Sequence, residues 1–229
     1  MPPRAALAEP LKRISVISRC RRLFTEPVPW PSLSEEFGDY SRYFKGTVLN
    51  AGAGDRDLSP FIEGQLYNQD LPHGRHNRNI DIEAPLHSIP VPDEFFDAVI
   101  CNAVLEHVQN PTEIMREFYR VLRRGGSLYL AVPFMQPEHL DPTDFQRYTE
   151  DGLNKLVHDH RFKVLKSEGL HTVYHTLVWV TAEWLRAKRT LPYLLLGLVL
   201  LPVLRSRCRH SRTFVHSLAS GYRVLATKV

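Results

Sequence analysis

The chain has 229 residues, of which 43% are hydrophobic and 24% are charged, a balance typical of a globular domain and not of a disordered chain. Its length is near the upper end for a single domain and is sufficient for a sizeable core. The three cysteines are widely spaced and odd in number, so they predict no disulfide framework and no zinc site. We therefore predict a cytoplasmic protein, and we expect no metal site.

Residues 1–44 are predicted to form an N-terminal extension or lid. Prolines lie at both ends of this segment, and a basic stretch from Lys12 to Phe24 between them is expected to form a short helix. Charges are interleaved with the apolar residues of this stretch and do not precede a continuous apolar run. We therefore expect no signal peptide.

Apolar runs alternate with helical patterns from residue 45 to residue 135. This alternation predicts a mostly parallel sheet with helices on both faces. Strands are expected near 47–51, 65–70, 79–82, 97–102 and 127–133. A helix is expected from Thr112 to Arg123, closed by Gly125 and Gly126.

The first predicted strand runs into Asn50-Ala51-Gly52-Ala53-Gly54. Glycine lets the backbone turn sharply and approach a ligand closely. The third glycine of a G-x-G-x-x-G motif would fall at Asp57, so the glycine pair alone does not distinguish a cofactor loop from a chance pair.

Asp70 follows Asn50 by 20 positions, at the end of the next predicted strand. Dinucleotide-binding folds place an acid about 20 residues after the loop, where it accepts from the ribose hydroxyls. A turn aspartate before Leu71-Pro72 is the alternative interpretation. Together, the loop and the acid predict a nucleotide-type cofactor.

The most specific pattern begins at Ile89, where IPVPDEFFDAVICNAVLEHV leads through a helical stretch to RVLRRGGSLYLAVPF. Over about residues 45–150 this order of motifs resembles the class I S-adenosylmethionine-dependent methyltransferases, and not the nicotinamide-dependent dehydrogenases. The resemblance implies a Rossmann-like sheet of seven strands, parallel except for an antiparallel last strand. The sixth and last strands are then expected near 162–168 and 221–227. It also implies S-adenosylmethionine as the cofactor.

The resemblance assigns cofactor contacts to several residues near the strand ends. N–H groups around Ala51, Gly52 and Gly54, with the start of a following helix, would bind the methionyl carboxylate. Asn50 stands where relatives often carry an acid, and its amide oxygen would accept from the methionyl ammonium. Asp70 would bind both ribose hydroxyls.

The adenine side of the implied site departs from the family pattern. Pro85 stands where relatives commonly carry an aspartate for the adenine amino group, and Asp81 or Glu83 would have to compensate. Leu86 would donate its backbone N–H to the ring, and Asn102 would line the pocket. Because of these departures, a catalytically degenerate scaffold or binding subunit remains the alternative function.

Acid–base chemistry is a minor requirement of methyl transfer, because the sulfonium is already a good electrophile and alignment with exclusion of water matters most. His139, after the fifth predicted strand, is either the base for an acceptor hydroxyl or a solvated loop histidine. His107 is a structural or cofactor-lining residue or a second base. Arg147 either pairs with Asp144 or binds an acidic or phosphorylated substrate.

An insertion is predicted at about residues 171–216 within a methyltransferase domain that spans residues 45–229. Val173, Leu177, Val180 and Trp184 recur at spacings of four, three and four, which predicts one apolar helical face. Residues 191–204 are apolar almost throughout. As a helix they would reach about 21 Å, less than the roughly 30 Å hydrocarbon core, so we do not expect them to span a bilayer.

The C-terminal charges are all of one sign. No Asp or Glu follows Trp184, whereas nine Lys and Arg do, and subtracting these nine from the net charge of +4 leaves −5 for residues 1–183. An apolar segment with flanking arginines suits peripheral contact with an anionic membrane through residues 186–212. The alternatives are a buried helix pair or a dimer face. Nucleic acid is not expected, because no aromatic residues are interleaved along a basic groove.

The sequence therefore predicts a transferase that uses S-adenosylmethionine to methylate oxygen, in preference to nitrogen, on a small-molecule, sugar or lipid-linked acceptor. It identifies neither the acceptor nor the oligomeric state.

Overall fold

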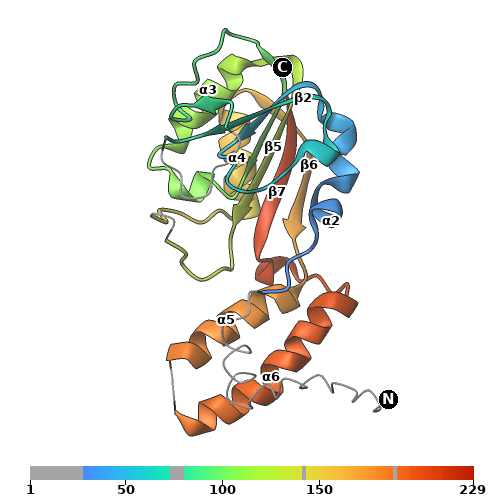
Figure 1. Cartoon of the computed structure of the whole chain (residues 1–229), viewed down its shortest axis with the longest axis vertical. Coiled ribbons are helices and arrows are strands. Elements are labelled where there is room, and N and C mark those ends of the chain that lie inside the picture. Colours follow the sequence, from blue (N-terminus) through green and yellow to red (C-terminus); the bar gives the residue numbers. More distant parts are fainter. Residues whose placement is uncertain (1–27, 73–79, 141–142, 188–189) are drawn as a thin grey trace, which may run out of the picture.

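The computed structural model of the chain describes residues 28–72, 80–140, 143–187 and 190–229 (Figure 1). The helix that the sequence predicts at 12–24 lies outside the described residues.

Seven strands form a single sheet in the order β3-β2-β1-β4-β5-β7-β6. Their bounds are β1 Lys45–Ala51, β2 Glu63–Asp70, β3 Ile82–Glu83, β4 Phe96–Asn102, β5 Leu122–Pro133, β6 Phe162–Leu170 and β7 Gly221–Lys228. β7 pairs antiparallel with both of its neighbours, and the other neighbouring pairs are parallel. The predicted seven-stranded sheet with an antiparallel last strand is confirmed.

Both faces of the sheet are covered by helices. Successive side chains of the central strands point to opposite sides and pack against the helices on each side. On one face, Leu49 packs with the helices α3 (Pro111–Val121) and α4 (Glu150–Asp159). On the other, Val48 packs with α2 (Leu33–Phe37), the 3-10 helix η1 (Gly38–Tyr43) and the 3-10 helix η2 (Ser59–Phe61). Figure 1 shows α2 and α3 on opposite sides of the sheet.

Two local predictions were wrong. The helix expected at 112–123 ends at Val121, and residues 122–125 extend β5 instead. No α-helix follows the glycine loop, since residues 52–62 contain only η2.

The described part of the predicted N-terminal extension belongs to the core. Phe37, Tyr40 and Phe44 are each at most 2% exposed and pack around Tyr129 of β5. The boundary predicted between residues 44 and 45 therefore does not separate two packing units.

The predicted insertion forms two helices between β6 and β7, α5 (Val173–Ala187) and α6 (Leu191–His210). They lie beyond one end of the sheet and pack on each other through Ala182, Leu185 and Leu201 (Figure 1). The predicted apolar face of α5 is not its packed face. Leu177, Val180 and Trp184 are 38%, 46% and 45% exposed.

α6 is longer than the apolar segment that the sequence predicts, with 20 residues and an internal Pro202. At 1.5 Å per residue its length is about 30 Å. By length and composition alone α6 qualifies as a membrane-crossing helix, and 22% of its most apolar window is buried. The length argument against a membrane span therefore does not hold for the whole helix.

Candidate active site

Parallel strands bring their carboxyl ends to one edge of the sheet, where open α/β sheets bind ligands. A cavity of about 360 Å³ opens there, beyond β4 and β5. Its wall includes Trp30, Glu36, Asn102, Glu106, His139 and Trp179. The N-terminal segment contributes Trp30 and Glu36 to this wall, and the insertion contributes Trp179.

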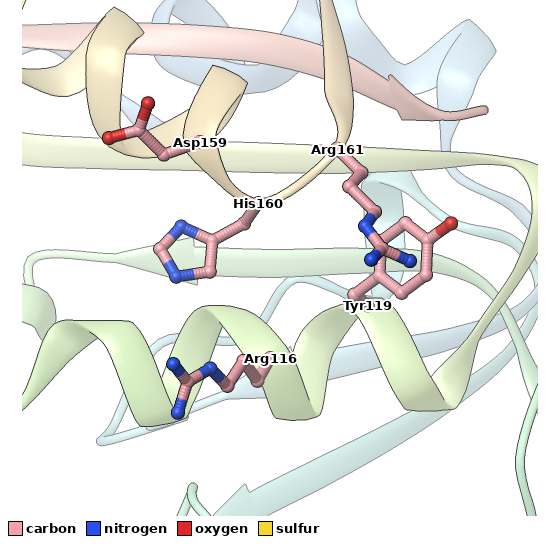
Figure 2. Close-up of a pocket in the computed structure, with 5 residues that line it drawn as sticks. All are labelled: Arg116, Tyr119, Asp159, His160 and Arg161. Carbon is pink, nitrogen blue, oxygen red and sulfur yellow. The ribbon is translucent and has the colours of Figure 1, made fainter.

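A second cavity, of about 300 Å³, lies at the opposite edge, where β6 begins. Figure 2 shows His160 and Arg161, at the turn from α4 to β6, pointing toward α3, which carries Arg116 and Tyr119, while the carboxylate of Asp159 points away from it. It contains no residue of the predicted site. The cavity at the carboxyl ends is therefore the candidate active site.

The glycine loop turns as predicted. Gly52 and Gly54 have positive φ angles of 67° and 56°, which glycine adopts without steric cost. A Cβ on Gly52 would lie 2.6 Å from Val104 Cγ2, so the loop packs against the segment after β4. A Cβ on Gly54 would meet nothing within 4 Å, which leaves space for a ligand beside the loop.

The loop is tied to the end of β2. Gly52 N donates to Gln69 Oε1 at 3.0 Å, and Gly54 N donates to Asp70 Oδ2 at 2.9 Å. These donors are engaged within the protein and no helix start lies beside them. Binding of the methionyl carboxylate by these N–H groups stays a prediction, and it requires them to exchange their present acceptors. Gln69, which accepts from Gly52 N, is fully buried. In the sequence, only its position directly before Asp70 could have indicated that it binds the glycine loop.

Asp70 remains suited to a nucleoside. Its Oδ1 accepts from Leu71 N at 2.7 Å and its Oδ2 from Gly54 N, which leaves one further lone pair on each oxygen for a ribose hydroxyl. Asp81 lies nearby, where its Oδ2 accepts from Asn68 N at 2.8 Å. The carboxylate of Asp70 and the space beside Gly54 together fit the nucleoside part of S-adenosylmethionine.

The other predicted cofactor residues occupy different surroundings. Asn50 is buried and donates from its amide to Asn68 Oδ1 at 3.0 Å. The side chain of Leu86 lies in the core, as does that of Ala51. Asn102 lines the cavity and donates to Glu36 Oε1 at 2.9 Å, which links the end of β4 to α2.

The two predicted histidines come together around a buried carboxylate. The rings of His107 and His139 have centroids 5.0 Å apart. Glu106 Oε1 lies 3.7 Å from His107 Nε2 and 3.6 Å from His139 Nε2. Interaction with this carboxylate raises the pKa of His139. Glu106 lies in the LEHV stretch quoted above. A Glu-His pair in a sequence does not indicate that the carboxylate is buried.

Arg147 does not face the cavity as a substrate ligand. Its guanidinium binds both oxygens of Asp144 and donates to the carbonyls of Pro137 and Gln146. Asp144 in turn accepts from the backbone N–H of His139 at 3.0 Å. The ion pair with Asp144, given as the alternative, is confirmed, and the substrate role stays a prediction.

Aromatic side chains surround the cavity mouth, an arrangement that the sequence did not predict. Trp30 stacks on His175 and contacts Trp179 edge-on, with centroid distances of 5.9 and 5.3 Å. Trp179 also lies 5.9 Å from His139. Burial lowers the pKa of the neighbouring His171 to about 3, so this ring is neutral. The mouth is therefore largely apolar and uncharged on this side.

Comparisons with known proteins agree with this geometry. Residues 64–130 match the family model described as a methyltransferase domain. A ubiquinone biosynthesis O-methyltransferase of Pseudomonas entomophila is 30% identical over 84 residues, 37% of this chain and 35% of that protein. A ubiquinone/menaquinone biosynthesis C-methyltransferase of Xanthomonas campestris pv. campestris is 29% identical over 137 residues, 58% of this chain and 48% of that protein. The chain spans between a third and a half of the length of these relatives.

The fold extends the likeness to nearly the whole chain. A solved SAM-dependent methyltransferase from Archaeoglobus fulgidus superposes with a TM-score of 0.53 at 16% identity, covering 86% of this chain and 93% of that one. The sheet defines a Rossmann-like α/β fold, and Asp70 ends β2 at its carboxyl edge. The matched segment and the fold are thus similar to those of S-adenosylmethionine-dependent methyltransferases.

Proposed function

We propose that this protein transfers the methyl group of S-adenosylmethionine to an oxygen of a small-molecule, sugar or lipid-linked acceptor. The observation that carries the proposal is that two features share the carboxyl edge of the sheet, where Arg56 from the segment after Gly54 lines the cavity. Asp70 and the open space beside Gly54 fit the nucleoside, and the wall of the cavity includes Glu106 and His139.

The cofactor supplies an activated methyl group on a sulfonium. The protein's part is to hold the acceptor oxygen in line and to exclude water. The hydrogen bond from Asn102 to Glu36 fixes one part of the cavity wall, and Trp30 and Trp179 line another part. As the oxygen–carbon bond forms and the sulfur–carbon bond breaks, the hydroxyl proton leaves toward the Glu106–His139 pair and then to solvent.

The matched relatives include an O- and a C-methyltransferase by name, so likeness alone does not select the acceptor atom. Oxygen is favoured by the cavity wall, where a carboxylate and an imidazole 3.6 Å apart suit removal of a hydroxyl proton. The test is transfer of labelled methyl from S-adenosylmethionine to a panel of phenols, sugars, lipids and amines. Label on hydroxyl acceptors supports the proposal, and label on carbon or amine acceptors alone contradicts it.

A degenerate scaffold subunit is the second candidate. It is favoured by the internal engagement of the Gly52, Gly54 and Asn50 donors and by Pro85 in place of an acid. Such a subunit would show neither cofactor binding nor transfer to any acceptor.

We also propose that the helix pair rests on the cytoplasmic surface of a membrane. Its exposed apolar surface, here called the α5–α6 surface, consists of Leu177, Val180, Trp184, Leu191, Leu194, Leu195, Leu196, Val199 and Val203, each at least 38% exposed. Arg186, Arg207 and Arg209 lie near it on the same two helices, with no acid after Glu183. Apolar contact bordered by cations suits anionic lipid. Because Trp179 of α5 lines the cavity, a lipid-linked acceptor would reach the site from this surface.

Replacing Leu195 by glutamate is expected to abolish capture by anionic vesicles. The substitution places a charge on the centre of the α5–α6 surface, where the leucine is 55% exposed, so folding is not affected. Flotation with vesicles of phosphatidylglycerol and phosphatidylcholine measures capture. Leu165→Glu, at a 47% exposed leucine on β6, is the matched control and should float like the unmodified protein. Equal flotation of both variants would remove the membrane proposal, and resistance of binding to carbonate extraction would indicate a span by α6 instead.

A further inference from the structure

We infer that Glu106, His107 and His139 form a site for one divalent transition-metal ion in the wall of the cavity. The sequence predicted no metal, because that prediction rested on the cysteines. These three ligands come instead from the 3-10 helix η3 (Leu105–His107) and from the loop after β5. Only the fold brings them together.

The spacing of the ligand atoms fits an ion. One ligand atom from each of the three side chains lies within 4.8 Å of the others, and Glu106 Oε1 is 3.6 and 3.7 Å from the two Nε2 atoms. With bonds of about 2.1 Å, a tetrahedral ion separates its ligands by about 3.4 Å. Small side-chain rotations therefore suffice to close the site. The same distances are too long for direct hydrogen bonds between these groups.

The carboxylate of Glu106 needs a cation. It is fully buried, and neither of its oxygens accepts a hydrogen bond from any group in the described part of the chain. A buried carboxylate in this situation is costly unless a charge or a donor compensates it. A metal ion held by Glu106 and two imidazoles provides that compensation.

Each imidazole has an oxygen acceptor behind its second ring nitrogen, and that of His107 is within hydrogen-bond distance. His107 Nδ1 lies 2.5 Å from the carbonyl oxygen of Thr143 and donates to it, which leaves the lone pair of Nε2 directed toward Glu106. His139 Nδ1 faces Asp144 Oδ2 at 3.6 Å, and Asp144 is held by Arg147 and by the backbone N–H of His139. A carbonyl or carboxylate behind the second ring nitrogen is the usual support of a metal-bound histidine. This gives Asp144 and Arg147 a positioning role.

Two imidazoles and one carboxylate suit Zn²⁺, Mn²⁺, Fe²⁺ or Co²⁺ better than Ca²⁺ or Mg²⁺, which prefer oxygen ligands. Three protein ligands leave at least one position open. Glu106 and His139 line the cavity, so the open position faces an acceptor there. This last step rests on the proposed function and, when the ion is bound, takes the place of the Glu106–His139 base: a metal-bound hydroxyl would lose its proton more readily, to water, before its oxygen attacks the methyl group.

The test is metal binding by the tag-free, EDTA-treated full chain, titrated with ZnCl₂ in a calorimeter without cofactor. We expect one equivalent to bind, and Glu106→Gln and His139→Gln to weaken binding at least about 100-fold. Asp144→Asn should weaken it about 10–100-fold, as loss of a supporting partner does. His158→Gln, at an exposed histidine of α4, should bind like the unmodified protein. Visible absorption of bound Co²⁺ reports the same site independently.

Melting temperatures with and without Zn²⁺ distinguish a metal site from a cluster that only stabilises the fold. We expect Zn²⁺ to raise the melting temperature of the unmodified chain and not that of Glu106→Gln, whereas without metal the Glu106→Gln variant should be at least as stable as the unmodified chain. Failure to bind Zn²⁺, Co²⁺ or Mn²⁺, or equal binding by Glu106→Gln, would overturn the inference. Since S-adenosylmethionine binding is measured separately, such a failure would leave the proposed methyl transfer standing.

Discussion

Replacing Asp70 by alanine is expected to weaken S-adenosylmethionine binding by at least about 100-fold. Each oxygen of this carboxylate has a lone pair left for one ribose hydroxyl, and hydrogen bonds to a charged group contribute about 1.5–3 kcal/mol each. The loss of two such bonds corresponds to about 100-fold or more in affinity. The variant also removes the acceptor of Gly54 N, so the glycine loop loses one of its ties to β2.

Calorimetric titration of S-adenosylmethionine into both proteins measures this effect. Asp57→Ala is the matched control, because Asp57 is an exposed acid near the same loop, and among the described residues its side chain accepts from Ser59 alone. We expect the control to bind as the unmodified chain does. Equal affinity in Asp70→Ala would show that the nucleoside does not lie at the end of β2.

Replacing Gly64 by alanine is expected to destabilise the fold by about 4 kcal/mol or more. Gly64 has a φ of 144° and pairs with Gly46 across β1 and β2. A Cβ there would lie 2.0 Å from the backbone oxygen of Gly46 and within 3 Å of two further backbone atoms of that residue. A partner strand cannot rotate away as a side chain can. The strands must separate, which disrupts the pair that carries the glycine loop and Asp70.

Thermal unfolding followed by circular dichroism checks this expectation. For a chain of this size, a loss of about 4 kcal/mol lowers the melting temperature by roughly 8–16 °C. Gly125→Ala is the control, because Gly125 also has a positive φ, of 76°, but a Cβ there meets nothing within 4 Å. In Gly125→Ala, the strain of a positive φ alone costs about 1–2 kcal/mol. Similar melting temperatures for the two variants would show that the close approach of β1 and β2 is not a constraint.

The sheet was predictable because its strands are continuous apolar runs that end in turn residues. Val48 and Leu49 are both fully buried, on opposite faces, so such a strand needs no polar alternation. The position of Asp70 was predictable for a similar reason, since the acid ends the strand next to the glycine loop. Where neighbouring parallel strands end at one edge of a sheet, the spacing of residues along the chain indicates which side chains lie close together there.

Features that depend on packing between distant segments were not predictable. The recurrence of Leu177, Val180 and Trp184 indicates an apolar helical face, but it does not indicate whether that face meets a partner helix or solvent. Likewise, the pattern LEHV contains Glu106 and His107, but only the loop after β5 adds His139 and leaves the carboxylate without a hydrogen bond. In the sequence Gln69 resembles any polar strand residue, and only the folded structure shows that its side chain accepts from Gly52 N.

The central claim is that S-adenosylmethionine binds at the ends of β1 and β2. Isothermal titration of the full chain with S-adenosylmethionine tests it most directly. The account predicts one binding site with micromolar affinity and a melting temperature that rises with cofactor concentration. No heat of binding and an unchanged melting temperature at millimolar cofactor would contradict it and favour the scaffold.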